Sequence, residues 1–304
     1  GTVLKEYTLS YGDAIPAQEK PTREGYTFVS WDKNVPDTVS DENVKNGKLV
    51  FQAVWKEIAY TISYNLAGGS LPTGKTNPTT FTINSKPMDL VQPKREGYTF
   101  EGWSGTDIKE KDTQVTVTAR PLKDRTYTAN WKENSYTIVF NVEGEVTRGE
   151  MKNIPLRYTQ ETTIPKNGYV CGGYKFVGWR TGGKKSEQKV YQPGDKVSRL
   201  CATNNGTVNL YPIWEPCEYT ITFDYQTGNK REKVTCKYKE TYTFPTVNRL
   251  GWTFEGWSRS AGSTNVISYA PNVKTAVFED EKDLTLYAVY KPITSAVFTG
   301  QTEH

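Results

Sequence analysis

The strongest nucleophiles in the sequence are its four cysteines, at positions 171, 201, 217 and 236. A catalytic thiol needs a base held beside it, yet the only histidine, His304, is the last residue given. Neither Cys–His nor Ser–His–Asp catalysis is therefore expected. The Gly-x-Ser-x-Gly elbow, the phosphate-binding loop and the His-Glu-x-x-His motif are also missing from the sequence. The chain is predicted not to be an enzyme.

The residue types that bind metals are present, but their spacing does not favour a site. No two cysteines form a Cys-x-x-Cys pair, as zinc sites often require. The aspartates lie in separate copies or loops, without the alternating Asp/Asn spacing of a calcium loop. Those considered are Asp107, Asp112, Asp195 and Asp224. We interpret them as solvated carboxylates and predict no metal and no cofactor.

Four cysteines allow three disulfide pairings, and the sequence decides neither among them nor between disulfides and free thiols. Pairing within a copy would join Cys171 to Cys201 and Cys217 to Cys236, and the alternative is four free thiols. The first half of the chain has no cysteine, so its fold does not depend on disulfides.

Composition narrows the class of protein. Hydrophobic residues make up 36% and aromatic residues 13%, which is too aromatic for a disordered chain. The net charge of +4 is too small and too dispersed to indicate a nucleic-acid surface. No apolar run approaches the roughly 18 residues of a membrane span. Because the chain begins with Gly1 rather than Met, we expect it to be part of a longer precursor.

A seven-residue signature occurs four times, roughly 75 residues apart. It begins with glycine, continues with an aromatic residue and phenylalanine, and ends with tryptophan, at residues 25–31, 97–103, 173–179 and 251–257. After each copy comes a short segment that ends in another aromatic residue, at 51–55, 127–131, 210–214 and 286–290. Three copies open with an alternating segment, at 60–65, 136–141 and 219–224. This period of two predicts strands, and no stretch has helical periodicity.

Aromatic residues recur at the same positions of each copy, and this recurrence indicates their structural role. All eight tryptophans occupy signature positions, which favours a role in the core of each copy. The glycine that begins each signature is predicted to hold a turn with a positive φ or a close backbone approach. Each signature also follows a proline, at a predicted strand edge or turn: Pro21, Pro93, Pro165 and Pro245.

These copies predict a tandem array of domains. The predicted bounds are 1–57 for the first repeat, which lacks an opening strand, then 58–133, 134–216 and 217–292, with 293–304 as a tail or the start of a further strand. Only four residues separate the aromatic residues at each junction, without a Gly/Ser-rich linker. Flexible beads need longer joints, so we expect a stiff, elongated array.

The opening, signature and closing segments together resemble the Listeria–Bacteroides repeat family, which includes the B repeat of the listerial internalins. Residues 219–223, 97–103 and 127–131 carry the resemblance most closely. It implies a β-rich α+β fold of small β-grasp-like (ubiquitin-like) modules, in a secreted or cell-wall-attached bacterial protein that acts in spacing or adhesion. The chain departs from the pattern at Ser30, which replaces a glycine, at Tyr290, which replaces a tryptophan, and in the enlarged middle of the third copy.

That enlarged middle, residues 180–209, is the predicted place for specific recognition, because loops that grow on a constant scaffold tend to carry binding. A solvated hairpin face is the alternative interpretation. The candidate ligand-binding residues are Arg180, Lys184, Lys185, Tyr191, Asn204 and Asn205.

Two functions are compatible with these features. The first is a non-catalytic stalk that presents other domains from the cell wall of the producing bacterium. The second is an adhesin module whose loops bind a host-cell or matrix protein or a cell-surface glycan. In both cases we expect a monomer at the cell surface, with no nucleic-acid partner and no membrane span within this chain.

Overall fold

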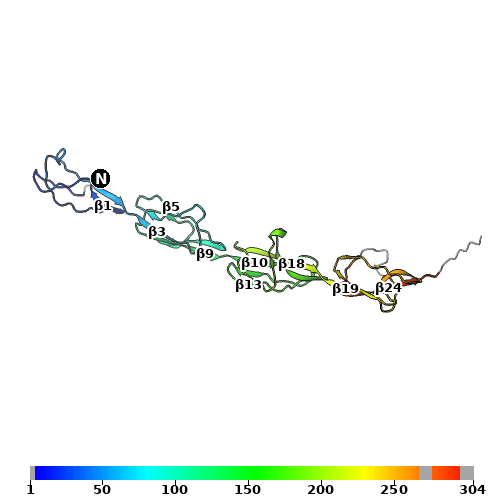
Figure 1. The fold of residues 1–304 in the computed structure, drawn as a ribbon. Helices are drawn as coiled ribbons and strands as arrows, with labels where there is room; N and C mark the ends of the chain where they lie inside the picture. The colour runs from blue at the N-terminus through cyan, green and yellow to red at the C-terminus, as the bar shows by residue number, and fades with distance from the viewer. Residues whose placement is uncertain (1–3, 267–275, 295–304) are drawn as a thin grey trace, which may run out of the picture. The chain divides into compact units, whose positions relative to one another are not determined.

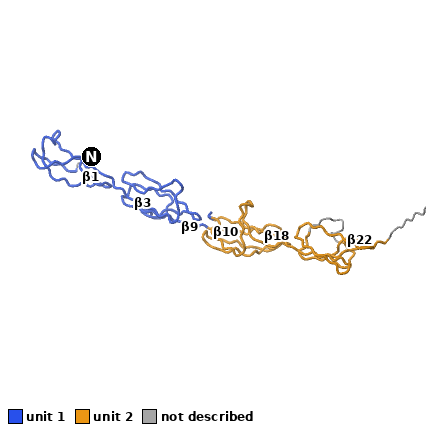
Figure 2. The backbone as a smooth tube through the Cα atoms, in the orientation of Figure 1, with its two compact units in different colours: residues 1–134, 202–204 blue, residues 135–201, 205–304 orange. Residues whose placement is uncertain are grey.

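A computed structural model describes residues 4–266 and 276–294. The chain divides into two compact units, which Figure 2 shows in different colours. Unit 1 comprises residues 1–134 with 202–204, and unit 2 comprises residues 135–201 with 205–304. The predicted first and second repeats lie in unit 1, and most of the third and all of the fourth lie in unit 2.

The second repeat contains a mixed five-stranded sheet in the order β4-β3-β9-β6-β7 (Figure 1). Its strands are β3 (Tyr60–Asn65), β4 (Thr80–Phe81), β6 (Tyr98–Gly105), β7 (Ile108–Asp112) and β9 (Arg125–Glu133). The opening strand β3 runs parallel to the closing strand β9, and the other neighbours are antiparallel. A small second sheet pairs β5 (Met88–Asp89) with β8 (Thr116–Val117).

The third repeat has the same sheet order, β12-β10-β18-β15-β16. Its strands are β10 (Ser135–Phe140), β12 (Ile154–Arg157), β15 (Tyr174–Thr181), β16 (Val190–Tyr191) and β18 (Gly206–Pro216). Two further pairs join β11 (Val146–Arg148) to β14 (Val170–Cys171) and β13 (Thr162–Thr163) to β17 (Lys196–Val197). A short 3-10 helix, Lys185–Glu187, lies between β15 and β16.

The fourth repeat has the order β20-β19-β24-β22, and the first repeat has a single pair of strands. The strands of the fourth are β19 (Glu218–Asp224), β20 (Arg231–Lys237), β22 (Trp252–Ser258) and β24 (Leu284–Pro292), with a small pair of β21 (Thr241–Tyr242) and β23 (Ala276–Val277). In the first repeat β1 (Tyr26–Trp31) pairs with β2 (Ala53–Glu57).

The predicted β-rich fold is confirmed. The opening, signature and closing segments form strands where they were expected, except that the closing strand of the first repeat begins only at Ala53 rather than at Phe51. The helical part of an α+β class is small: in residues 4–266 and 276–294 the 3-10 helix is the only helix. The predicted tail, residues 293–304, lies mostly outside the described residues.

The tryptophan that ends each signature forms the centre of a core in three repeats. Trp103, Trp179 and Trp257 have no exposed surface. Each indole meets the signature phenylalanine edge to face, with ring centroids 5.6, 5.1 and 5.4 Å apart. In the first repeat Trp31 is only partly buried. The core prediction is therefore confirmed for Trp103, Trp179 and Trp257, whereas the other five tryptophans are only partly buried.

The tryptophan that ends the closing strand has a different role. Trp131 and Trp214 are half-buried, and their indole N–H groups donate to the carbonyl oxygens of Leu66 (3.0 Å) and Glu143 (3.1 Å). Both acceptors lie just after an opening strand. This second tryptophan thus fastens the end of the opening strand to the closing strand beside it.

Glycines shape the signature at two points. The first glycine of every copy has a positive φ, as predicted: Gly25, Gly97, Gly173 and Gly251. The later glycine follows a β-bulge, where the register between signature and closing strands shifts. At Gly102 φ is +124°, and an added Cβ would lie 2.8 Å from the backbone of Asp112. Ser30 occupies this bulge position in the first repeat without a positive φ.

The hydrogen bonding between the signature and closing strands of each repeat continues into the junction that follows. The residue after each closing strand donates its N–H to the carbonyl oxygen of the first signature glycine, at 2.8–3.0 Å. The pairs are Ile58 with Gly25, Asn134 with Gly97, Cys217 with Gly173, and Ile293 with Gly251. After the first three of these bonds the next opening strand begins within two residues. Little of these three junctions is therefore free of regular hydrogen bonding.

All four cysteines are free thiols in the structure. Cys217 stands opposite Tyr238 and Cys236 opposite Tyr219, so the two cysteines are diagonal neighbours on adjacent strands. Diagonal Cα atoms are about 7–8 Å apart, beyond the usual span of a disulfide.

The other pairing is not formed because its cysteines lie at opposite ends of the third repeat. Cys201 packs on the core near Tyr136, at the start of β10, whereas Cys171 pairs with Val146, beyond its end. Of the two states that the sequence left open, the structure has the free thiols.

Replacing Gly102 with alanine should destabilise the second repeat by about 1–3 kcal/mol, because alanine must take a positive φ against the backbone of Asp112. Ser30→Ala, at the same bulge position in the first repeat, should cost less than about 0.5 kcal/mol. Denaturant-dependent hydrogen exchange of the β6 and β9 amides measures the first change. Equal effects of the two substitutions would contradict this account of the bulge.

Candidate functional site

Arg180, the first of the predicted ligand-binding residues, lies on β15 and is engaged within its own repeat. Its guanidinium donates to the carboxylate of Glu143 at 2.6 Å and lies 5.1 Å from the centre of the Tyr211 ring. The side chain is only 24% exposed. Its charge is therefore largely used to hold the end of the opening strand near β15.

Tyr191 is also part of the fold. It lies on β16 opposite Trp179, is half-buried, and packs against the core of the third repeat. Burial raises the pKa of its phenol above the ordinary value. The main role of the Tyr191 ring is therefore to pack against this core.

The two lysines are exposed, as Asn204 and Asn205 also are. Lys184 and Lys185 are exposed in the connection between β15 and β16, where Lys185 begins the 3-10 helix. This connection spans residues 182–189, whereas the equivalent hairpin of the second repeat turns through residues 106–107 alone. It is closed by a hydrogen bond from Gln188 to the carbonyl oxygen of Gly183 (3.0 Å).

The asparagines lie at another part of the repeat. Asn204 and Asn205 precede β18, and the side-chain oxygen of Asn205 accepts a hydrogen bond from Ser135 at 3.0 Å. Arg180 pairs with Tyr211, six residues further along β18, or about 20 Å away at strand spacing. The structure thus does not bring Arg180 and Asn205 into one site. Ligand binding by the six residues stays a prediction.

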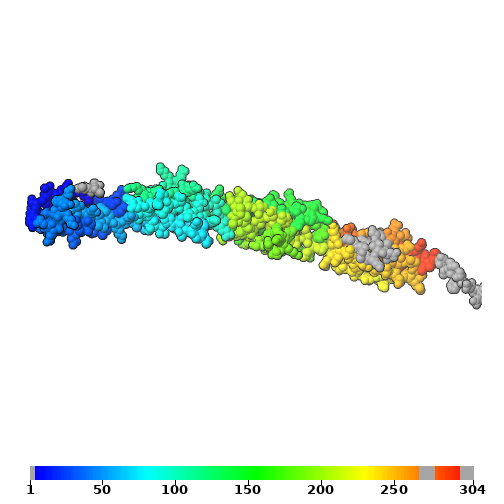
Figure 3. Space-filling model, turned by 90° about the horizontal axis from the view of Figure 1, so that it is seen from above, coloured from blue at the N-terminus to red at the C-terminus, as the bar shows by residue number. Residues whose placement is uncertain are grey.

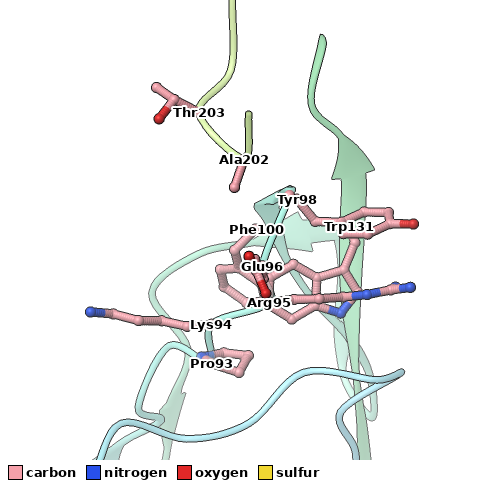
Figure 4. A pocket seen from close by; sticks show the side chains of 10 residues that line it. Pro93, Lys94, Arg95, Glu96, Tyr98, Phe100, Trp131, Ala202 and Thr203 are labelled. Atoms are coloured by element: carbon pink, nitrogen blue, oxygen red, sulfur yellow. The ribbon is translucent and has the colours of Figure 1, made fainter. Parts of the chain in front are cut away.

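A shallow hollow of about 580 Å³ in unit 1 was not predicted from the sequence (Figure 4). Its lining is Pro93, Lys94, Arg95, Glu96, Gly97, Tyr98, Phe100, Trp131, Ala202 and Thr203. Figure 4 shows the side chain of Lys94 directed away from the rings of Tyr98 and Trp131. The hollow is open to solvent, and the rings of Tyr98, Phe100 and Trp131 are part of its lining.

The cation that stacks on Tyr98 is structural. The guanidinium of Arg95 lies 3.7 Å from the centre of the Tyr98 ring and donates to the carbonyl oxygen of Ala67. The same stacking recurs as Arg23 on Tyr26 (3.9 Å) and Arg249 on Trp252 (4.5 Å). The sequence signal that could have revealed it is an arginine three residues before the aromatic residue of the signature.

The buried thiols are poorly suited to nucleophilic chemistry. Burial raises the pKa of both Cys171 and Cys236 above the ordinary thiol value. Less of each group is then present as thiolate, the reactive form, at neutral pH. In the described residues no group of three or more metal-ligating side chains is gathered together.

Close side-chain contacts join neighbouring repeats within each unit. In unit 2 the ring of Tyr238, just after β20, lies against Gly173 so closely that an added Cβ would be 2.3 Å from it. Tyr238 also meets Tyr174 edge to face, with ring centroids 5.3 Å apart. Lys239 forms an ion pair with Glu145 at 2.6 Å. We call this set of contacts the joint of unit 2.

Unit 1 has a joint built on the same positions. Ile83, two residues after β4, covers Gly25 and would lie 2.8 Å from an added Cβ. The next residue, Asn84, donates to the hydroxyl of Tyr26 at 2.7 Å and to the carboxylate of Glu57. The space-filling view shows the blue atoms of the first repeat adjoining the cyan atoms of the second (Figure 3).

Packing rather than charge gives each joint its specificity. The ion pair of Arg120 with Glu24 in unit 1 is at least 60% exposed on both sides. Exposed pairs contribute about 0–1 kcal/mol. The contact of a bulky side chain with a bare glycine backbone is harder to replace, because any Cβ there must displace the neighbour.

The chain belongs to the Listeria-Bacteroides repeat domain family. The family profile matches four times, at residues 1–52, 60–129, 136–211 and 219–289. These matches confirm the resemblance that the opening, signature and closing segments indicated.

Relatives of the chain are much longer than the matched region. A "Putative Gly-rich membrane protein" of Evansella cellulosilytica is 24% identical over 261 residues, which is 84% of this chain and 28% of the relative. A "Putative membrane protein" of the same organism is 25% identical over 79% of this chain and 33% of its own length. Internalin H of Listeria monocytogenes is 30% identical over 37% of this chain and 20% of its own. This chain spans a third or less of each.

The described residues contain no helix long and apolar enough to cross a membrane.

Gly173→Ala should disrupt the joint of unit 2. Alanine there must take a φ near +72° and also push Tyr238 away. In a double-mutant cycle with Tyr238→Ala, the two changes should be non-additive by about 0.5–3 kcal/mol, because each removes the same contact. The free energy of unfolding of the fourth repeat, from hydrogen exchange of the β20 amides, gives the four values of the cycle.

Gly251→Ala is the matched control. Gly251 has a similar φ of +78°, but an added Cβ there meets no atom within 4 Å. Its cycle with Tyr238→Ala should be additive within about 0.5 kcal/mol. Additivity in both cycles would show that the Gly173–Tyr238 contact does not couple the repeats.

Proposed function

We propose that this chain is a non-catalytic stalk in a surface-attached bacterial protein, where it presents other domains away from the cell wall. The observation that carries this proposal is the bond from each junction residue to the preceding signature glycine, repeated four times. A junction residue that is hydrogen-bonded to the preceding repeat has less freedom to rotate, and a spacer requires limited rotation between its repeats. The joints of units 1 and 2 support the same conclusion.

The modules are proposed to be β-grasp-like. What supports this is the mixed sheet of the second and third repeats, in which the first and last long strands are parallel neighbours at the centre. The crossover from the second strand to the signature strand is made by short strands and turns in the described residues, not by a long helix. The proposed class is thus a β-grasp topology with an irregular crossover.

A surface location is supported by the relatives. Two are named as membrane proteins and one as an internalin, and each is several times longer than the matched region. We infer that this chain is likewise one part of a larger protein at the cell surface. Attachment to the cell wall and a monomeric state belong to the same proposal.

Adhesion is a second candidate function, and the long hairpin of the third repeat favours it. Residues 182–189 carry three exposed lysines, Lys184, Lys185 and Lys189, and no fully buried side chain. The fold of the second repeat is complete with a far shorter turn at this place. A host-cell or matrix protein or an anionic glycan is the proposed ligand of this hairpin.

Small-angle scattering tests the stalk. Four modules of about 75 residues in a row should give a radius of gyration of roughly 34 Å, against about 19 Å for one globule of this length. The joint variant Gly173→Ala should leave the molecule equally long on average but broaden its distance distribution. A value near 19 Å would overturn the stalk proposal.

Binding of the labelled chain to host cells, matrix proteins and a glycan panel tests adhesion. The double substitution Lys184→Ala/Lys185→Ala should reduce saturable binding at least tenfold if the hairpin is the binding surface, a loss of about 1.4 kcal/mol. Lys109→Ala/Lys111→Ala, on β7 of the second repeat, is the matched control and should bind normally. Unchanged binding by the hairpin variant would exclude this hairpin as the adhesive surface.

A further inference from the structure

The hollow of unit 1 is lined by three aromatic rings that are only partly buried. They belong to Tyr98 and Phe100 on β6 and to Trp131 on β9. In Figure 4 these rings lie between Pro93 on one side and Ala202 on the other. The volume of about 580 Å³ is within the range of roughly 300–1,000 Å³ that small-molecule sites have.

The rings are held in place by contacts within the protein. Arg95 stacks on the Tyr98 ring, with its guanidinium 3.7 Å from the ring centre. The Phe100 ring meets the Trp131 indole edge to face at 5.4 Å, and the indole N–H donates to the carbonyl oxygen of Leu66 at 3.0 Å. A ligand that enters the hollow therefore meets aromatic side chains that are already ordered, so binding loses little conformational entropy.

The equivalent ring makes a contact with the next repeat in two other places. In the first repeat the hydroxyl of Tyr26 accepts a hydrogen bond from Asn84 at 2.7 Å. In the third repeat the ring of Tyr174 meets the ring of Tyr238 edge to face at 5.3 Å. Because neighbouring residues occupy this position in both repeats, the signature alone does not explain an open hollow in the second.

The hollow also contains a carboxylate that is available to a ligand. The Glu96 side chain lines the hollow, is exposed, and has no hydrogen bond or ion pair with the residues that the structure describes. Of the two cations in the lining, Arg95 is used in the stack on Tyr98, and Lys94 is directed away from the rings (Figure 4). An ionised carboxylate only accepts hydrogen bonds, so its natural partner is a donor such as a hydroxyl group.

This combination of features specifies the chemistry of the ligand. A purely apolar ligand needs enclosure, since small-molecule pockets bury about 70–90% of their ligand and this hollow is open to solvent. A sugar ring presents C–H groups on one face, which the negative faces of aromatic rings attract. Its hydroxyl groups donate to a carboxylate or stay in water. An anionic sugar would be repelled by Glu96.

We propose that the hollow is a binding site for a neutral oligosaccharide. One pyranose ring stacks on the aromatic surface formed by Tyr98, Phe100 and Trp131, and its hydroxyl groups donate to the carboxylate of Glu96. Further sugar units extend through the open side of the hollow into solvent. The site does not involve the lysine hairpin of residues 182–189, for which a protein or an anionic glycan is the proposed ligand, and it is compatible with a stalk.

Titration of the full chain with neutral tetrasaccharides, followed by NMR, tests the site. The probes are cellotetraose, chitotetraose, maltotetraose and mannotetraose. At least one should bind saturably and shift the signals of the Gly97 amide and the Trp131 indole N–H. The indole signals of Trp179 and Trp257, in other repeats, should stay unchanged. Saturable binding by none of the four, or shifts confined to another repeat, would overturn the proposal.

Two exposed glutamates of the second repeat form a matched pair of variants. Glu96→Ala removes the proposed acceptor and should weaken binding of the best tetrasaccharide at least tenfold. Glu110→Ala removes the same charge from β7, outside the lining, and should bind within threefold of the parent. Both side chains are exposed, so both variants should fold. Equal affinities of the two variants would contradict the role of Glu96.

Substitutions of Ala202 test whether the sugar occupies this hollow. Ala202→Gln places a longer side chain in the space beside the rings and should reduce the affinity at least tenfold. Ala202→Gly leaves the space open and should bind within threefold of the parent. Hydrogen exchange of the β6 and β9 amides shows whether the second repeat is still folded in each variant. Normal binding by a folded Ala202→Gln chain would overturn the assignment of the hollow.

A sulfated tetrasaccharide from heparin tests the predicted neutral charge of the ligand. It should not displace the neutral sugar, because the carboxylate of Glu96 repels it. Lys184→Ala/Lys185→Ala, in the hairpin of the third repeat, should leave binding of the neutral sugar unchanged. Displacement by the sulfated sugar would contradict a neutral ligand, and loss of binding in the lysine variant would place the sugar at the hairpin instead.

Discussion

The parallel pairing of the opening strand with the closing strand is the interaction on which each repeat depends. These two strands lie at opposite ends of the repeat in sequence, and the closing strand is covered on both edges only when they meet. With that pairing in place, an isoleucine of the opening strand and the signature tryptophan are almost fully buried, as Ile138 and Trp179 are. Where it is missing, in the first repeat, Trp31 stays partly exposed and half of the closing strand is not formed.

Much of this arrangement could be predicted because its signals are local. Alternation of β-branched and aromatic residues indicates strands, and a glycine before an aromatic residue indicates a turn with positive φ, as at Gly97. The parallel direction of β3 and β9 could not be read from the sequence, because nothing within either strand specifies a partner about 60 residues away. The joint between Gly173 and Tyr238 was missed for the same reason, since its two residues are neighbours only after both repeats have folded.

The candidate binding residues show a different limit of sequence reasoning. Arg180 and Tyr191 were selected because they lie in the enlarged middle of the third repeat, but the fold uses one to hold Glu143 and the other to cover Trp179. Position in an enlarged segment does not reveal whether a side chain's partner lies within the protein. Lys184, Lys185, Asn204 and Asn205 are the candidates that the fold leaves exposed. The hairpin that carries the two lysines is longer than its counterpart in the second repeat. It is where this chain has added sequence without adding to the core.

The position of the chain ends within each repeat determines how the array would respond to mechanical force. The first and last strands of a complete repeat are parallel neighbours, so a pull on the two ends draws them in opposite directions along their common axis. The hydrogen bonds between them are then loaded together in shear, rather than opened one at a time as in a hairpin peeled from its end. The bond from the residue after each closing strand to the first signature glycine continues this pairing to the end of the repeat. A complete repeat built in this way should be mechanically strongest when it is pulled along the direction of its own chain.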